Sequence, residues 1–285
     1  MKAIRSVAVV GAGTMGLGIA LVCASQGFDT LLYDLLPSQT EKALRAIDGN
    51  LSQRVEKGKL TAIKKSEIRA RIRPANTLSD LRVDLVIEAA VERLDIKKKL
   101  LADLEIINEG KAILATNTSS ISVSEIAGGL KDPSRCIGIH FFNPADRMQL
   151  VEIISGEATS RPCLDQMRKF AADIGKTAVL AKDSPGFIVN RVARPYYAEA
   201  LRLLEGGVGS VFDIDALLRS AGFKMGPFEL MDLIGVDTNL AVTTSVYEGM
   251  GKPSRFKPSR TQQQLVAQGS LGRKSGKGFY EYSPK

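Results

Sequence analysis

The stretch Val7-Ala8-Val9-Val10-Gly11-Ala12-Gly13-Thr14-Met15-Gly16 determines how the first half of this chain can fold. Residues 4–10 form an apolar run of the length of a buried strand, and residues 17–25 are apolar and small, as in a helix packed closely on a sheet. Residues 28–33 form a second apolar run that ends at Asp34. Strand, glycine turn, helix and strand in this order predict a βαβ unit at the start of a parallel sheet.

The glycine turn has the G-x-G-x-x-G spacing of a dinucleotide-binding motif. Its first glycine permits the tight turn, its second lets a pyrophosphate approach the backbone, and its third lets helix and strand pack closely. The helix N-terminus offers free N–H groups and a favourable dipole to the phosphates. The motif contributes Gly11, Gly13, Thr14, Met15 and Gly16 to the predicted site. Asp34 is placed to bond the adenosine ribose hydroxyls and would repel a 2′-phosphate, so we expect NAD rather than NADP.

The overall composition is that of an ordinary globular protein. The chain has 285 residues, of which 44% are hydrophobic and 25% are charged, and this length fits one large or two modest domains. Lysine and arginine exceed aspartate and glutamate by 39 − 31 = 8, which favours an anionic partner. Because the sequence shows neither a nucleic-acid motif nor a basic stripe with interleaved aromatic residues, we expect a small phosphorylated ligand rather than nucleic acid.

The three cysteines, Cys23, Cys136 and Cys163, are scattered along the chain. They lack the spacing of metal ligands and imply no disulfide framework, so we expect no metal site and a reducing, cytoplasmic location. The first apolar run is too short for a signal peptide and leads directly into the glycine turn. No apolar run approaches the ~18 residues of a membrane-spanning helix, so we expect no membrane partner.

The region after the glycine motif continues to alternate between helix and strand patterns. Residues 37–73 have helical spacing and many charges, which predicts a helical hairpin with a basic tip. Apolar runs that predict further strands comprise residues 84–90, 112–116, 135–140, 150–154 and 178–181, and helix patterns occupy 96–107 and 160–175. The sequence therefore predicts an α/β fold: an N-terminal Rossmann-type doubly wound sheet with an inserted helical hairpin.

The composition changes at Lys182-Asp183-Ser184-Pro185-Gly186, which divides the chain into domains 1–183 and 184–285. The second domain has helical patterns throughout and is predicted to be all-α. Pro185 suits the first turn of a helix capped by Asp183 or Ser184, and Pro195 should kink or break that helix. Its predicted apolar face comprises Phe187, Ile188, Val192 and Tyr196. The aromatic residues of the segment 272–282 predict an ordered tail that docks on the domain.

His140 is the only histidine of the chain and ends an apolar strand just before the turn Asn143-Pro144. A proton-transfer role near neutral pH would fall to it, and the alternative is a hydrogen-bonded core histidine without a catalytic role. Glu152 stands alone in the apolar run 150–154, and a buried carboxylate needs a partner. His140 on a neighbouring strand would supply that partner, and Glu152 would then orient the ring.

Polar residues follow two other predicted strands, at the edge where open α/β sheets bind ligands. Glu92 and Lys97 lie just past the strand 84–90, and Asn117 to Ser120 follow the strand 112–116. We expect Asn117 and Ser119 among the residues that face the cofactor. Helix capping by the serines is the alternative, and it is compatible with a functional role.

Together with several further motifs, these residues resemble the 3-hydroxyacyl-CoA dehydrogenase family, in particular its short single-function members such as 3-hydroxybutyryl-CoA dehydrogenase. The likeness extends over essentially the whole chain. Its marks are Gly-Ala-Gly-Thr-Met-Gly (11–16), Val-Ile-Glu-Ala-Ala-Val-Glu (86–92), Thr-Asn-Thr-Ser-Ser (116–120), His-Phe-Phe-Asn-Pro (140–144), Pro-Gly-Phe-Ile-Val-Asn-Arg (185–191), Met-Gly-Pro-Phe-Glu-Leu (225–230) and Gly-Arg-Lys-Ser-Gly-Lys-Gly-Phe-Tyr (272–280).

The resemblance implies a role for individual residues. His140 and Glu152 would be the catalytic pair, and Ser119 and Asn190 would hold the reacting oxygen. Positions that match NAD contacts are Asp34, Glu92, Lys97, Asn143 and Lys274, and positions that match coenzyme A contacts are Ser52 and Lys59, with Ser119 beside the substrate. The second domain would carry the interface of a homodimer.

The resemblance also implies the activity, an NAD-dependent interconversion of (S)-3-hydroxyacyl-CoA and 3-oxoacyl-CoA, with 3-hydroxybutyryl-CoA and acetoacetyl-CoA as the expected pair. Two places depart from the family pattern, at Asp146-Arg147-Met148 and at Lys224. The run 191–200 is also similar to members that act on 3-hydroxyadipyl-CoA, so Arg147 or Lys224 could meet a polar acyl end; surface drift is the alternative. Rival interpretations are a related dehydrogenase of free sugar acids and a non-catalytic NAD-binding protein like the lambda-crystallins.

Overall fold

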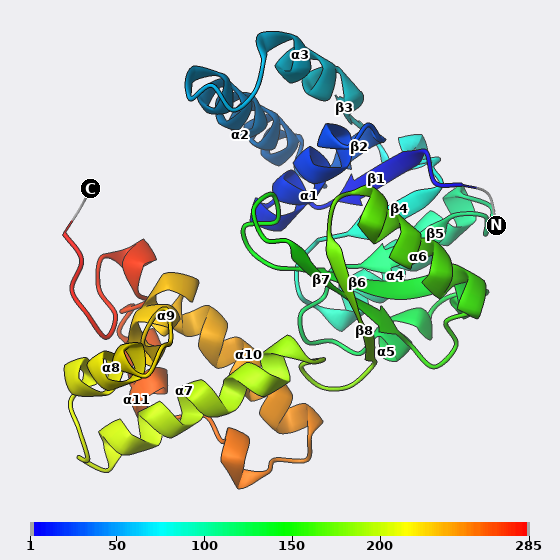
Figure 1. The fold of residues 1–285 in the computed structure, drawn as a ribbon. Coiled ribbons are helices and arrows are strands. Elements are labelled where there is room, and N and C mark those ends of the chain that lie inside the picture. Colours follow the sequence, from blue (N-terminus) through cyan, green and yellow to red (C-terminus); the bar gives the residue numbers. More distant parts are fainter. Residues whose placement is uncertain (1–2, 284–285) are drawn as a thin grey trace. The chain divides into compact units, whose positions relative to one another are not determined.

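The computed structural model describes residues 3–283, and the chain divides into two compact units, the first ending at Ser184 and the second beginning at Pro185 (Figure 1). The division lies one residue from the predicted boundary between residues 183 and 184. The first unit contains the sheet, and the second is built of helices. The predicted fold class, a Rossmann-type sheet followed by an all-α domain, is thereby confirmed.

The sheet has eight strands in the order β3-β2-β1-β4-β5-β6-β7-β8. Their bounds are β1 Ser6–Val10, β2 Asp29–Tyr33, β3 Ile72–Pro74, β4 Leu85–Glu88, β5 Ile113–Thr116, β6 Cys136–Phe141, β7 Leu150–Ser155 and β8 Thr177–Lys182. Each neighbouring pair from β3 to β6 is parallel; β7 is antiparallel to β6, and β8 is parallel to β7. The short strand β3 was not predicted, because its three residues follow the helical pattern of the hairpin without a break.

Helices cover both faces of this sheet. Their bounds are α1 Thr14–Ser25, α2 Pro37–Glu56, α3 Ala62–Arg71, α4 Leu94–Ile107, α5 Val123–Ala127 and α6 Arg161–Asp173. After β1 the chain adds β2 and then β3 on one side of it, and it later adds β4 and then β5 on the other side. Because such crossover connections are right-handed, α1 and α4 lie on opposite faces of the sheet. The strand order therefore reverses between β1 and β4, and their carboxyl ends form the edge at which such sheets bind dinucleotides.

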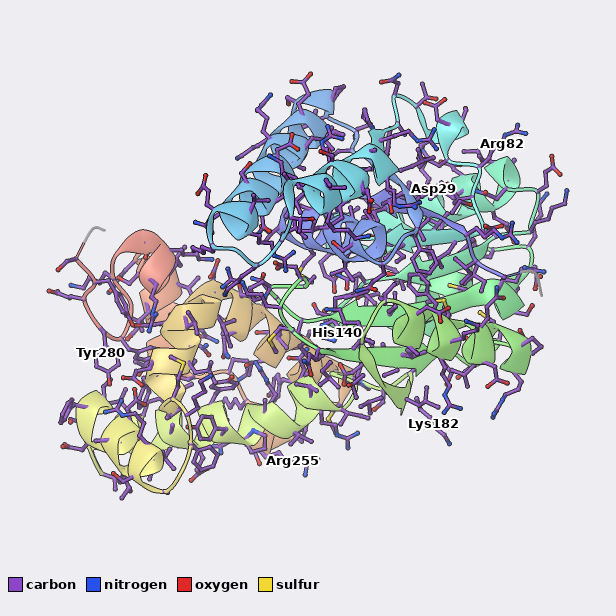
Figure 2. The ribbon with its side chains drawn as sticks, turned by 45° about the horizontal axis from the view of Figure 1, so that its top comes forward. Asp29, Arg82, His140, Lys182, Arg255 and Tyr280 are labelled. Carbon is purple, nitrogen blue, oxygen red and sulfur yellow. The ribbon has the colours of Figure 1, made fainter. Side chains whose placement is uncertain are left out.

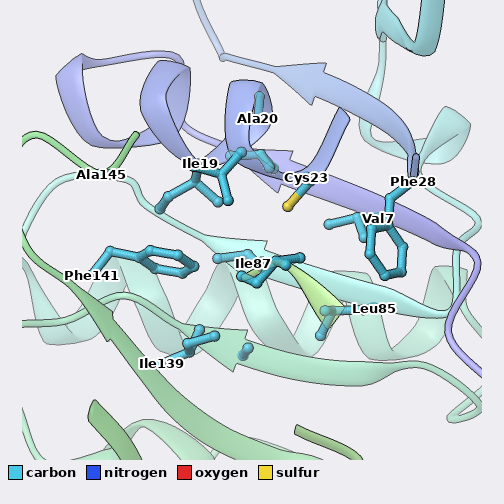
Figure 3. Packing of buried hydrophobic residues seen from close by; sticks show 14 of the residues in the cluster. Val7, Ile19, Ala20, Cys23, Phe28, Leu85, Ile87, Ile139, Phe141 and Ala145 are labelled. Carbon is cyan, nitrogen blue, oxygen red and sulfur yellow. The ribbon is translucent and has the colours of Figure 1, made fainter. Parts of the chain in front are cut away.

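The helix α1 packs on the sheet through one face, as Figure 3 shows for Ile19 and Cys23 above Ile87. Small residues of α1 permit this close approach, and side chains from α6 complete the same buried cluster, with the Phe28 and Phe170 rings 5.2 Å apart edge to face. The three cysteines are free and buried, and burial raises the pKa of the Cys23 thiol to about 12. These thiols therefore behave as small apolar groups of the core.

The predicted helical hairpin is present as α2 and α3. The helix α2 begins at Pro37 and buries Ala43, Ile47 and Leu51, which are spaced four residues apart along one face. The side chain of Thr61 accepts a hydrogen bond from the backbone N–H of Lys64 and so caps α3. The hairpin thus extends from the sheet as an amphipathic pair with a polar outer surface.

The second unit consists of helices around a small apolar core. Their bounds are α7 Val189–Glu205, α8 Val211–Ser220, α9 Pro227–Ile234, α10 Val236–Gly249 and α11 Arg260–Ala267. The core comprises Tyr197, Ala200, Leu201, Ile214, Phe228 and Met231. The C-terminal tail, in which Figure 2 labels Tyr280, docks on it as predicted. The backbone N–H groups of Phe279 and Tyr280 donate to Asp232, and the Tyr280 hydroxyl donates to Asp215 at 2.8 Å.

The start of α7 differs from the prediction in three ways. The helix begins at Val189 rather than Pro185, and Asp183 instead accepts hydrogen bonds from Ser122 and Ser124 at the start of α5. Pro195 does not break α7, because a proline removes one backbone hydrogen bond without ending a helix held by tertiary packing. Of the predicted apolar face, Phe187 is buried, whereas Ile188 and Val192 are 40% and 72% exposed.

Candidate active site

The glycine turn between β1 and α1 forms a tight cradle at the carboxyl edge of the sheet. A Cβ atom on Gly16 would lie 1.7 Å from the carbonyl oxygen of Gly11, and one on Gly11, whose φ is +104°, would lie 2.5 Å from the carbonyl oxygen of Ala89. A Cβ on Gly13 would meet no protein atom within 4 Å. The first and third glycines are therefore required by the fold, whereas the second leaves room for a ligand beside the backbone.

The N-terminus of α1 is open to an anion. Its N-cap is Gly13, which supplies no side-chain cap, and the first turn contains no acidic residue. Gly13 and Thr14 are exposed. Free N–H groups and the helix dipole can therefore meet a pyrophosphate at this position, which is the arrangement that the sequence predicted for NAD.

The carboxylate of Asp34 lies beside the same turn, just after β2. Its Oδ2 accepts a hydrogen bond from the backbone N–H of Ala12 at 2.8 Å, and its Oδ1 accepts one from that of Leu36 at 3.0 Å. These two bonds fix the orientation of the carboxylate. The remaining lone pairs can accept the two hydroxyls of an adenosine ribose.

A buried carboxylate at the end of β4, that of Glu88, was missed by the sequence analysis. It accepts hydrogen bonds from the Lys97 ammonium at 2.7 and 2.9 Å, from the Thr116 hydroxyl at 2.6 Å and from the Ala90 N–H at 2.7 Å. Glu88 and Lys97 are 0% and 1% exposed. The signal that could have found Glu88 is the one that identified Glu152, a single carboxylate within an apolar strand.

The neighbouring carboxylate of Glu92 connects this ion pair to the loop after β5. The Lys97 ammonium lies 3.2 Å from Glu92 Oε2, while the Thr118 hydroxyl and the Ser119 N–H donate to Oε1 at 2.7 and 2.9 Å. Burial alone would raise the pKa of Glu92, but the Lys97 charge and the hydrogen bonds from Thr118 and Ser119 outweigh it and lower the pKa below its usual value. Glu92 is therefore ionised at neutral pH and holds Ser119 in place.

Asn117 and Asn143 flank the strand that carries His140. The Asn117 side-chain oxygen accepts a hydrogen bond at 2.8 Å from the backbone N–H of Phe141, the residue after His140. Asn143 is exposed just beyond the end of β6, where it precedes Pro144. Asn117 thus joins the ends of β5 and β6 directly beside the histidine.

The predicted pairing of His140 with Glu152 is confirmed, because Nδ1 of the ring lies 2.8 Å from Oε2 of the carboxylate. The two residues are directly opposite each other in the antiparallel pair β6–β7, which places their side chains on the same face. His140 is 6% exposed and Glu152 is fully buried. A carboxylate in this position fixes the ring and stabilises an imidazolium, as in other general acid–base pairs.

The remaining predicted site residues belong to the helical hairpin and to the second unit. Ser52 on α2 accepts a hydrogen bond at 2.7 Å from the ammonium of Lys65, one of the lysines of the predicted basic tip, and Lys59 is exposed at the turn between α2 and α3. Asn190 and Lys274 belong to the second unit. Asn190 occupies the first turn of α7, and Lys274 pairs with Asp237 at 2.6 Å.

Comparisons with known proteins identify the family. Residues 6–184 match the model of the 3-hydroxyacyl-CoA dehydrogenase NAD-binding domain, and residues 186–282 match that of the 3-hydroxyacyl-CoA dehydrogenase C-terminal domain. The chain belongs to the 3-hydroxyacyl-CoA dehydrogenase family. The resemblance stated from the sequence is thereby confirmed, and the glycine turn and Asp34 lie within the residues that match the family's NAD-binding domain.

The relatives of this dehydrogenase are named after two different substrates. A 3-hydroxyadipyl-CoA dehydrogenase of Escherichia coli K12 is 49% identical over 98% of this chain and 59% of its own length. A 3-hydroxybutyryl-CoA dehydrogenase of Bradyrhizobium diazoefficiens is 42% identical over 98% of this chain and 96% of its own. The crystal structure of 3-hydroxybutyryl-CoA dehydrogenase from Escherichia coli K12 has a TM-score of 0.96 at 48% identity and covers all of this chain and 61% of that one. This dehydrogenase thus spans about three fifths of two of these proteins.

The described part of the dehydrogenase contains no cluster of histidine, cysteine, aspartate or glutamate that could hold a metal ion. Nor does any of its described helices combine the length and the apolar character that crossing a bilayer demands.

Proposed function

We propose that this dehydrogenase interconverts (S)-3-hydroxyacyl-CoA and 3-oxoacyl-CoA by general acid–base catalysis at His140. The observation that carries the proposal is the 2.8 Å contact between the imidazole and Glu152 at the carboxyl edge of the sheet. In the oxidation, His140 takes the proton of the 3-hydroxyl group, and Glu152 stabilises the imidazolium that forms. In the reduction, His140 starts protonated and returns that proton to the oxygen.

Bound NAD supplies the acceptor or donor of the hydride. The chain's own contribution is position: the N-terminus of α1 holds the pyrophosphate, and Asp34 holds the ribose hydroxyls. Lys97 is already engaged with Glu88 and Glu92, so we assign it to holding Glu92. The partly exposed Glu92 carboxylate then contacts the cofactor. Asn117, Asn143 and Lys274 are assigned the same role.

Ser119 and Asn190 are proposed to donate hydrogen bonds to the oxygen as negative charge develops on it. Donors of this kind contribute about 2.7–4 kcal/mol each to the stability of a transition state. The Ser119 backbone is fixed by Glu92. For Asn190 the proposal rests on the resemblance to the family.

The hairpin α2–α3 is proposed to bind the phosphates of coenzyme A. Ser52 and Lys65 form one hydrogen-bonded pair there, and Lys59 is exposed at the adjoining turn. Both lysines carry the positive charge that a phosphate attracts. Lys65 is thereby added to the two residues that the sequence analysis assigned to this role.

Two acyl-CoA substrates, which differ in their acyl group, are candidates for this enzyme. 3-Hydroxybutyryl-CoA is favoured by the names of several full-length relatives, and 3-hydroxyadipyl-CoA by that of the relative with 49% identity. The two candidates differ in length and in a carboxylate at the distal end of the acyl chain. The side chains first considered for that end, Arg147 and Lys224, are both exposed.

The assembly is proposed to be a homodimer formed through the second unit, in a reducing cytoplasm that suits three free thiols. Four apolar side chains on α8 and its flanking loops are between 51% and 73% exposed: Val208, Phe212, Leu217 and Phe223. Exposed apolar side chains gathered on one element mark an interaction surface. A second copy of the chain is the partner that the family resemblance implies.

The deciding experiment is a steady-state assay of acetoacetyl-CoA reduction with NADH and with NADPH, on the wild type and on His140→Ala. We expect NADH to be preferred and the variant to lose about 10²–10⁴-fold or more in kcat, the range typical of a lost general acid. NADH affinity, measured by fluorescence, should be unchanged. A variant that retains wild-type kcat, or a wild type that reduces only ketones lacking the coenzyme A moiety, would contradict the proposal.

A further inference from the structure

Arg194 on α7 is a buried guanidinium whose partners are all neutral. Its Nε donates to the backbone carbonyl of Asn190 at 3.1 Å, and its Nη1 donates to the carbonyl of Asn239 and to the hydroxyl of Thr243, both at 3.0 Å. The guanidinium carbon lies 4.8 Å from the centre of the Tyr197 ring. The side chain is 4% exposed.

A buried charge normally has an opposite charge beside it, because removing an ion from water is costly. Among the described residues, no carboxylate forms an ion pair or a hydrogen bond with Arg194, and its Nη2 makes no hydrogen bond. Burial lowers the pKa of Arg194 to about 10, so the side chain still carries its charge at neutral pH. The positive charge is therefore maintained in the second unit without a counter-ion from these residues.

The position of Arg194 on α7 relates it to the reacting end of the substrate. Asn190, assigned above to the substrate oxygen, precedes Arg194 by four residues, so the two lie on one face of the helix, about 6 Å apart along its axis. In a 3-hydroxyadipyl group the distal carboxylate lies three carbon–carbon bonds beyond the carbon that carries the hydroxyl. That separation is of the same order as one helical turn.

We propose that Arg194 binds the distal carboxylate of a 3-hydroxy dicarboxylic acyl-CoA and so determines the specificity of the enzyme; this inference rests on the proposed function. The substrate supplies the missing counter-ion, and the planar guanidinium suits a carboxylate in both charge and geometry. A substrate with an apolar acyl end leaves the charge unpaired. Recognition of the dicarboxylic substrate therefore belongs to a residue inside the second unit, in place of the exposed Arg147 and Lys224.

The test compares kcat/KM for 3-hydroxyadipyl-CoA and 3-hydroxybutyryl-CoA, with NAD, in the wild type and in Arg194→Met. Methionine keeps much of the side-chain volume and removes the charge. We expect kcat/KM for the dicarboxylic substrate to fall about 30- to 5000-fold, the range for truncating one partner of a buried charge pair, mainly through KM. For 3-hydroxybutyryl-CoA it should change by less than about 3-fold. Arg147→Met and Lys224→Met are the matched controls and should leave both values near the wild type.

A structural role for Arg194 would give a different pattern. If Arg194→Met folds and loses activity equally on both substrates, or if the wild type does not prefer the dicarboxylic substrate, the inference is overturned while the proposed function stands. A wild type inactive on both acyl-CoA substrates refutes the proposed function itself. Should the variant fail to fold, competition by adipyl-CoA and hexanoyl-CoA on the wild type decides: equal inhibition by these two ligands of matched length excludes a carboxylate site.

Discussion

At the scale of single residues, the site is organised by carboxylates in apolar strands. Glu152 holds the imidazole of His140, and Glu88 holds the ammonium of Lys97. The sequence predicted the first pair because the chain has one histidine and Glu152 is isolated in an apolar run. It did not predict the second, since Lys97 and Thr116 meet Glu88 only after the helix α4 and the strand β5 have packed against β4.

The buried ion pair makes a prediction about stability. Replacing Lys97 by methionine leaves the Glu88 carboxylate buried without its counter-ion, so we expect the free energy of unfolding to fall by about 3–5 kcal/mol. Chemical denaturation followed by circular dichroism measures this change. Lys99→Met on the same helix is the control, because Lys99 is exposed and should change stability by less than about 0.5 kcal/mol. An equal effect of the two substitutions would show that the Lys97 ion pair contributes nothing.

The lowered pKa of Glu92 predicts how the free energy of unfolding depends on pH. Its pKa in the folded protein lies below its usual value of 4.5, so its ionised form contributes stability that is fully present above that pH and is lost as the pH falls below it. The wild type should therefore lose more unfolding free energy between pH 7 and pH 4 than Glu92→Gln, in which this group does not titrate. Parallel denaturation curves at the two pH values test this. The prediction fails if the variant shows the same pH dependence as the wild type.

At the scale of elements, periodicity and turn residues predicted the alternation of strands and helices, whereas tertiary packing decided the remainder. The strand β3 is only three residues long and owes its pairing to β2. The helix α7 continues through Pro195 and leaves Val192 exposed, although both features contradict the local pattern. The position of the site at the carboxyl edge of the sheet was predictable, because the ends of strands can be recognised in a sequence. The hydrogen bonds that connect neighbouring strand ends could not be predicted in this way.

The glycine turn makes a prediction that separates folding from binding. Gly13→Ala should keep the melting temperature within a few degrees, since its Cβ meets no protein atom and alanine at an N-cap costs about 1 kcal/mol. It should nevertheless weaken NADH binding, because the Cβ occupies the space beside the backbone that the pyrophosphate needs. Gly16→Ala should lower the melting temperature itself, because its Cβ overlaps the carbonyl oxygen of Gly11. Calorimetry and NADH titration distinguish the two, and identical behaviour of the variants would contradict this division of roles.

At the scale of the whole molecule, the division into a nucleotide-binding unit and a helical unit followed from a change of composition near residue 184. The apolar residues that remain exposed could not be predicted, because helical periodicity gives the same pattern for a face that packs inside its own domain and for one that packs on a partner. In the second unit, exposed apolar side chains of this kind lie on α8 and its flanking loops.

From the exposed apolar side chains on α8 we predict the oligomeric state of the protein. Phe212 on α8 is 64% exposed, and in a homodimer it would be buried against the second copy. Phe212→Glu places a charge in this apolar contact, so we expect light scattering to give the mass of one chain, 30.7 kDa, where the wild type gives twice that value. Ile63→Glu is the matched control, because Ile63 is 75% exposed on α3 of the first unit and should leave the dimer intact. A wild type of monomeric mass, or a Phe212→Glu variant that remains dimeric, would exclude α8 as the interface, and dissociation by both variants would show that the effect is not specific to this helix.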